Sequence, residues 1–355
     1  MNKIKTRHAI SIGILFSLGS IVINMGFNNE YLIQSLIISF LVSSIIIYFY
    51  QVLLNKYPNK NLFQIINEKQ NNILGKILIL FLLIILLINS VQIIYSFIDF
   101  ISTIIQLDFI SKNMIMLLNF ILLGYILKNT LINLSRFSQV IFVLTSLMII
   151  LLFIVGIKDM ELINLLPLYS FQKNDVFNNL NILVVQPFLE ITLLFNVFSK
   201  MENTKTKKNI FIITSGLSLM LLLLISIESI ALLGDNYTSF LNFPYYVAIS
   251  SINMSKIVIR IESLSLVVFY FSSFVKLLFI INSFMLGFNT LTNNKRKYNY
   301  PILLLSHVLS LIMFDNLVEL KQFMNYYSLS FIIISILIPF FIFIKKDKNI
   351  IKQNT

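Results

Sequence analysis

The chain has 355 residues, 57% of them hydrophobic and only 12% charged, with a mean hydropathy of +0.88; this composition excludes a soluble globular protein, whose surface must be polar, and indicates a membrane protein. It contains no Cys and only two His, which argues against disulfides, thiolate chemistry and metal sites. The formal charge of +12 comes from short basic clusters between apolar runs, a pattern that favours membrane topology over nucleic-acid binding.

A membrane-spanning helix needs about 20 apolar residues, and ten runs in this chain qualify. The first follows Lys3, Lys5 and Arg7 and is predicted to be a retained helix, because no small-residue cleavage site of a signal peptide follows it. The fourth and ninth runs are short, and the third and eighth are long enough to tilt or protrude. The predicted spans are Ala9–Phe27, Tyr31–Leu53, Leu74–Thr103, Asn113–Leu127, Phe137–Gly156, Ile182–Ser199, Ile210–Leu233, Ile257–Leu291, Tyr300–Phe314 and Tyr326–Ile344.

The Lys and Arg residues predict the orientation of these spans. One set of alternate loops, which includes both ends of the chain, carries most of the Lys and Arg residues, whereas the other set carries most of the acidic ones. Because basic loops stay in the cytoplasm, both termini are predicted to be cytoplasmic.

The longest exterior connection, Ile157 to Asn181, divides the ten spans into five and five. An odd number of spans in each half inverts the second half relative to the first, which is the topology of many secondary transporters. We therefore predict an all-α integral membrane protein that forms a single polytopic domain over residues 1–355. Its two five-helix inverted repeats would be residues 9–156 and 182–344, an arrangement of the LeuT type.

Helix-breaking residues occur in the first span of each half. The first span carries Gly19 and Ser20, and the sixth carries Pro187. Each has a simpler interpretation: a small-residue packing contact for the Gly-Ser pair, and a plain kink for the Pro. Their matching positions favour broken helices 1 and 6 that hold a small ligand near the middle of the membrane.

Charged residues inside apolar spans need a cavity or a partner, since each costs some 2.5–3.5 kcal/mol at the centre of an isolated span. Glu190 follows the predicted break and is the strongest candidate, although a neutral carboxyl that braces the kink is the alternative. Lys276 lies deep in the eighth span, where it would pair with an acid or replace a bound cation. Arg260 and Glu262, which open that span, are explained equally well by contact with the membrane interface.

These considerations give two sets of candidate residues. The charge-coupling or structural set is Arg260, Glu262 and Lys276. No nucleotide-binding loop, nucleophile motif or metal-ligand cluster appears, so we predict neither an enzyme nor a cofactor or metal site. The predicted ligand-binding set is Gly19, Ser20, Tyr95, Pro187, Phe188, Glu190 and Ser272.

Several short motifs, in order along nearly the whole chain, resemble those of the spore germination permease-like family, the B subunits of germinant receptors within the amino acid/polyamine/organocation superfamily. The sequence departs from the family pattern at His8 and Leu189 and in its lack of Trp, which bears on ligand choice. The motifs that carry the resemblance are Tyr57-Pro58-Asn59-Lys60-Asn61-Leu62-Phe63-Gln64-Ile65 with Leu74-Gly75-Lys76, Arg136, Leu165-Leu166-Pro167, Phe188-Leu189-Glu190 and Arg260-Ile261-Glu262-Ser263-Leu264.

The resemblance implies a sensor in the inner membrane of the spore. Such a subunit binds a small germinant, expected here to be an amino acid, in a transporter-like pocket and acts with an A-type channel subunit and a C-type lipoprotein. A gradient-driven amino acid or amine transporter is the alternative, and a scaffold with a vestigial pocket is a third reading. The lipid bilayer is a further expected partner, and nucleic acid is not.

Overall fold

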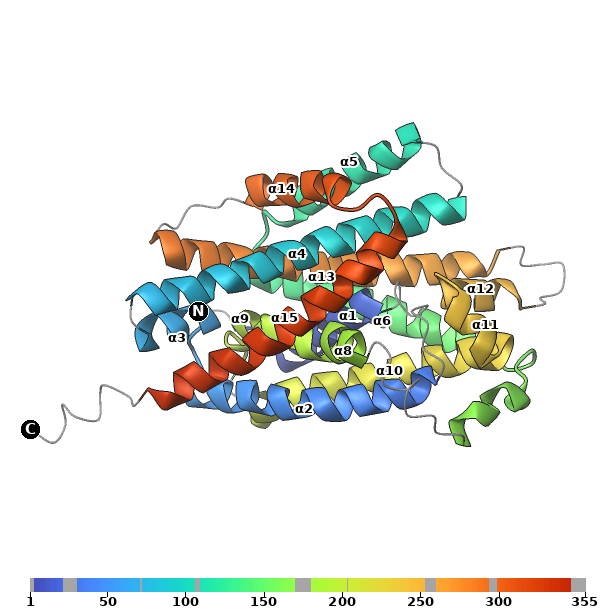
Figure 1. Ribbon diagram of the computed structural model, residues 1–355, viewed down its shortest axis with the longest axis horizontal. Helices are drawn as coiled ribbons and strands as arrows, with labels where there is room; N and C mark the ends of the chain where they lie inside the picture. Colours follow the sequence, from blue (N-terminus) through green and yellow to red (C-terminus); the bar gives the residue numbers. More distant parts are fainter. Residues whose placement is uncertain are drawn as a thin grey trace, which may run out of the picture.

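The computed structural model describes residues 3–21, 31–70, 72–105, 109–169, 180–202, 204–252, 260–293 and 299–345. These residues are helical apart from turns, loops and an isolated bridge between Ile4 and Met201 (Figure 1). Among them, seven helical segments are long and apolar enough to cross a membrane, and one of the seven is the irregular segment Leu180–Phe198. The prediction of an α-helical, multi-pass membrane protein is therefore confirmed at this level.

The long helices follow the predicted apolar runs closely. Three further helices, α1, α5 and α14, coincide with predicted spans that are not among the seven, and the ten-helix inverted repeat stays a prediction. The main helices are α1 (Thr6–Ile21), α2 (Leu32–Lys56), α4 (Asn72–Ile105), α5 (Phe109–Ile126), α6 (Leu131–Gly156), α10 (Ile210–Leu233), α13 (Glu262–Thr292), α14 (Asn299–Ile312) and α15 (Leu317–Ile344).

The connections contain helices that hydropathy alone does not predict. In α3 (Leu62–Lys69), the Asn61 and Gln64 side chains and backbones form a reciprocal cap at the N-terminus. The longest predicted exterior loop begins with a 3-10 helix, η1 (Leu162–Tyr169). The short helices η4 (Lys205–Asn209), α11 (Asp235–Phe240) and α12 (Pro244–Ser250) precede and follow α10.

The last helix begins nine residues before the predicted start at Tyr326. The Asn316 side chain accepts a hydrogen bond from the Glu319 backbone N–H at 2.9 Å, which caps α15 at this earlier point. Glu319 and Lys321 interrupt the apolar run there, so hydropathy underestimates the helix.

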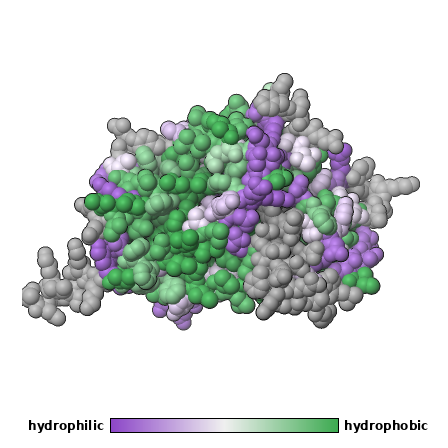
Figure 2. All heavy atoms as spheres, in the orientation of Figure 1, coloured by the Kyte–Doolittle hydropathy of each residue, from purple (hydrophilic) through white to green (hydrophobic). Residues whose placement is uncertain are grey.

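Helix α1 forms the centre of the molecule. Every residue from Ser11 to Ser20 is buried, and the helix packs against α6, α10 and α13. Around it, α2, α6 and α15 keep many large apolar side chains exposed, as expected for helices that face lipid. Figure 2 shows a broad hydrophobic field on the face of the molecule that is turned to the viewer in Figure 1, with hydrophilic groups at its left edge and to its right.

Candidate ligand-binding site

The chain segment that corresponds to the sixth predicted span does not form one regular α-helix. It passes through α8 (Leu180–Leu183), the π-helical turn η2 (Val184–Phe188), the 3-10 helix η3 (Leu189–Leu194) and α9 (Phe195–Phe198). Pro187 lies inside η2 and has no backbone N–H to donate to the preceding turn. The wide π-helical turn is followed by the tighter 3-10 helix, which contains Glu190, three residues after Pro187. The Glu190 side chain is buried in the interior of the molecule.

The Glu190 carboxylate forms an ion pair with the Lys276 ammonium group, which comes from α13. The two side chains are only 1% and 2% exposed. Ser20 on α1 bridges them: its hydroxyl lies 3.3 Å from Glu190 Oε2 and accepts a hydrogen bond from Lys276 Nζ. Lys276 Nζ also lies 5.3 Å from the centre of the Phe16 ring. These charges are thus buried together and compensate each other, as a low-dielectric interior requires.

The second carboxylate oxygen of Glu190 is held by two neutral donors. Tyr327 of α15 donates to Oε1 at 3.0 Å, and the Asn89 side-chain amide of α4 donates to the same atom. The Asn89 amide also donates to the Tyr327 hydroxyl at 2.7 Å. Glu190 therefore joins α1, α4, α13 and α15 to the irregular segment through its two oxygens.

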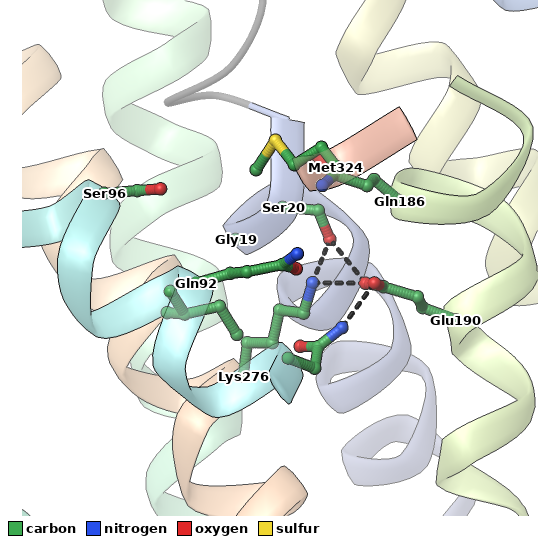
Figure 3. A pocket seen from close by; sticks show the side chains of 10 residues that line it. Gly19, Ser20, Gln92, Ser96, Gln186, Glu190, Lys276 and Met324 are labelled. Carbon is green, nitrogen blue, oxygen red and sulfur yellow. Dashed lines mark hydrogen bonds and ion pairs between the residues drawn. The ribbon is translucent and has the colours of Figure 1, made fainter. Parts of the chain in front are cut away.

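A small cavity opens beside this cluster, and Figure 3 shows Ser20, Glu190 and Lys276 pointing toward one another at its edge. Its free volume is about 10 Å³, which is room for about one water molecule. The wall contributed by α4 carries three buried polar atoms with no hydrogen-bond partner among the described residues: Asn89 Oδ1, Gln92 Nε2 and Ser96 Oγ. Buried polar atoms are nearly always satisfied, so this wall presents the chemistry of a polar ligand or water site.

Gly19 belongs both to the cavity wall and to a tight helix contact. A Cβ atom at this position would lie 2.6 Å from the backbone oxygen of Ser272 on α13. The Ser273 hydroxyl donates a 3.4 Å hydrogen bond to the Gly19 carbonyl oxygen. Glycine is therefore required by the close approach of two backbones, as in other small-residue contacts between membrane helices.

The structure brings some of the predicted residues to the cavity and leaves others away from it. Gly19, Ser20, Glu190 and Lys276 line the cavity. Helix α1 is regular through Gly19 and Ser20, where the sequence predicted a break. The residues that follow Ile21 in the predicted first span lie outside the described residues.

The other predicted residues have different surroundings and do not line this cavity. Phe188 packs edge-on against Phe40, and Ser272 donates its hydroxyl to the Val268 carbonyl of its own helix. The Tyr95 ring packs against Phe314. Six predicted residues therefore lie outside the cavity wall. Four are from the ligand-binding set, and two are charged residues at or just before the start of α13: Pro187, Phe188, Ser272, Tyr95, Arg260 and Glu262.

Sequence reasoning missed the uncharged polar residues that α4 and α15 contribute to the site. Asn89, Gln92 and Ser96 follow each other at intervals of three and four, which places them on one face of α4. An amide, amide and hydroxyl on one face of an otherwise apolar span is a signal that the sequence contains. Tyr327 gives no such signal, because tyrosine is common near the ends of membrane helices. Within the described part of the chain, no group of three His, Asp or Glu side chains is arranged to hold a metal ion.

Comparison with known families matches this chain to one of them. A family of permease-type membrane proteins, described as spore germination protein, matches residues 4–319. A search of curated proteins found none that matches the chain. The matched region contains Ser20, Glu190 and Lys276 and covers most of the chain. The protein therefore belongs to the spore permease family of spore germination proteins.

Proposed function

We propose that this protein is the ligand-sensing B subunit of a germinant receptor, and that it binds a small amino-acid-like germinant beside Glu190 and Lys276. Three unpartnered polar atoms on one face of α4, next to a buried ion pair, carry this proposal. A zwitterionic ligand needs hydrogen-bond acceptors for its ammonium group and donors for its carboxylate. Glu190 and Asn89 Oδ1 supply acceptors, whereas Lys276 and the Gln92 amide supply donors.

The small size of the cavity implies that the pocket must enlarge before a germinant enters. In the present arrangement, Lys276 occupies the side of Glu190 that a ligand ammonium group would take. The irregular hydrogen bonding of η2 and η3 offers a place where the helix can shift at a lower cost than within a regular α-helix. A ligand that binds only the enlarged state would shift the protein toward that state.

Family membership supports a role in spore germination, and the proposed subunit would act in a membrane complex with A-type and C-type partner subunits. We propose that the ten helices form two inverted repeats in the inner membrane of the spore, with both termini in the cytoplasm, as the basic loops predict. The same Glu190 and Lys276 pair is compatible with the alternative of a gradient-driven amino acid transporter. Uptake of labelled amino acid by liposomes that contain this chain alone would favour that alternative.

Germination of spores that lack the chain, challenged with amino acids, sugars and nucleosides, tests the receptor role. Loss of the response to one ligand class, restored by the wild-type gene, would identify that class. Spores with Ser96→Ala should then need more of the same germinant, since Ser96 lines the cavity. Ser90→Ala is the matched control, because the Ser90 hydroxyl is bonded to the Leu87 carbonyl of the same helix.

Glu190→Gln should raise the required germinant concentration more strongly than Ser96→Ala, because it removes the anion that would hold the ligand ammonium group. An unchanged concentration dependence in both variants, at normal protein abundance, would contradict the location of the pocket.

A further inference from the structure

A second cavity lies where the start of α1 meets the first turns of α6, away from the site at Glu190. Its volume is about 590 Å³, and it is open to the surroundings. Three cationic side chains line one part of it: Lys5, Arg7 and Arg136. Three apolar side chains of α6 also line it: Val140, Val143 and Leu144.

The cationic part of this groove has a net positive charge. The charges of Lys5, Arg7 and Arg136 all act on the ring of His8, a buried residue that also lines the groove, and Glu202 is the one acidic group that also does so. In the described part of the chain, none of the three cations has a carboxylate within ion-pair distance. The His8 ring lies 3.3 Å from the Ser135 hydroxyl, a contact that holds the start of α1 against α6. The cations are thus brought together by the fold and left without an anion.

The apolar part of the groove continues as a stripe along α6. Val140 is 61% exposed, and exposed Leu or Ile side chains follow at positions 144, 147, 151 and 154, spaced by about one turn. From residue 140 to residue 154 the helix rises about 21 Å at 1.5 Å per residue. One leaflet of the hydrocarbon core is about 15 Å thick, so the stripe is long enough for an acyl chain.

We propose that this groove binds an anionic phospholipid, with its phosphate group on Lys5, Arg7 and Arg136 and an acyl chain along α6. A clustered set of exposed cations next to an apolar stripe matches a molecule with a phosphate at one end and a hydrocarbon chain at the other. A free phosphate ion would make no use of the apolar wall. An acidic segment of a soluble partner would have to enter the lipid-facing side of α6. The lipid would hold the start of α1, the central helix, against α6.

Binding of phosphatidylglycerol and of phosphatidylcholine to the purified full-length chain, followed by native mass spectrometry, tests this proposal. We expect phosphatidylglycerol to bind several-fold more tightly than phosphatidylcholine. A surface charge near a lipid contributes about 1 kcal/mol, so Arg136→Gln should weaken phosphatidylglycerol binding about five-fold. Lys76→Gln removes another exposed cation, outside the groove, and should leave the affinity unchanged.

Equal affinities of the wild-type chain for the two lipids would overturn the proposal, as would equal effects of Arg136→Gln and Lys76→Gln. Glycerol 3-phosphate that competes as well as phosphatidylglycerol would instead identify a phosphate site without a lipid. If Arg136→Gln is unstable, Lys5→Gln and Arg7→Gln provide the same comparison from the other side of the contact, at and just before the start of α1. The preference of the wild-type chain for phosphatidylglycerol over phosphatidylcholine tests the proposal without the use of any variant.

Discussion

Replacing Lys276 by Met would leave the Glu190 carboxylate buried without the cation that lies beside it. Breaking a buried ion pair in this way typically costs 3–5 kcal/mol. Glu190 would still accept hydrogen bonds from Ser20, Asn89 and Tyr327. We therefore expect a loss of unfolding free energy near the lower end of that range, about 3 kcal/mol.

Glu190→Gln should cost more, because the buried ammonium group has fewer alternative partners. Lys276 would keep its hydrogen bond to the Ser20 hydroxyl and its position near the Phe16 ring. In the double variant Lys276→Met with Glu190→Gln, neither charge is buried. Its loss of unfolding free energy should therefore be smaller than the sum of the two single losses by about 2 kcal/mol or more.

Titration of the purified variants in micelles with SDS would measure the four unfolding free energies of this cycle. Neighbouring groups that interact give non-additive losses, whereas independent sites add to within about 0.5 kcal/mol. Additive losses would mean that the two charges do not stabilise one another, and the buried ion pair would be refuted as the centre of the site.

Substitutions at two further positions, Gly19 and Glu228, test the packing and the charge of buried residues. Gly19→Ala should push α1 away from α13, because its Cβ would lie 2.6 Å from the Ser272 backbone oxygen; a loss of about 1–3 kcal/mol should lower the melting temperature. Gly216→Ala is the control, since the nearest atom to its Cβ lies 4.0 Å away, and an equal loss in both would contradict this reasoning. Glu228 is fully buried and forms no ion pair among the described residues, so Glu228→Gln should change stability by less than about 1 kcal/mol, whereas Glu228→Lys should destabilise strongly. A large drop in melting temperature for Glu228→Gln would show that the carboxylate has a charged partner.

The long helices were predictable because the requirement for apolar side chains in lipid acts on every residue of a span. The predicted run Ile210–Leu233 has the same limits as α10. Hydropathy fails where polar residues are tolerated, as at the start of α15, and where short helices lie in connections, as with α11 and α12. Those elements are determined by local capping and by contacts with the rest of the molecule, which a count of apolar residues does not record.

The charged members of the site were easier to recognise than its neutral ones. A carboxylate or ammonium group inside an apolar span has a large burial cost, so Glu190 and Lys276 stand out in the sequence. That they pair with one another was not predictable, because the sequence does not say which helices face each other. Asn89 and Tyr327 cost far less to bury, so they are harder to recognise in the sequence. Both nevertheless donate hydrogen bonds to one of the two Glu190 carboxylate oxygens.

The position of Glu190 relates ligand binding to the arrangement of the whole bundle. Its partners come from four helices, and each of these helices also packs elsewhere in the molecule. A ligand ammonium group that replaced Lys276 at the carboxylate would change contacts on α13 and α1 together, since Ser20 bridges the two charges. Gly19 holds the same two helices backbone to backbone, so a shift of one helix is passed to the other. In the proposed receptor role, a binding event at this point would alter the outer surface of the bundle, where a partner subunit would detect it, without a complete transport cycle.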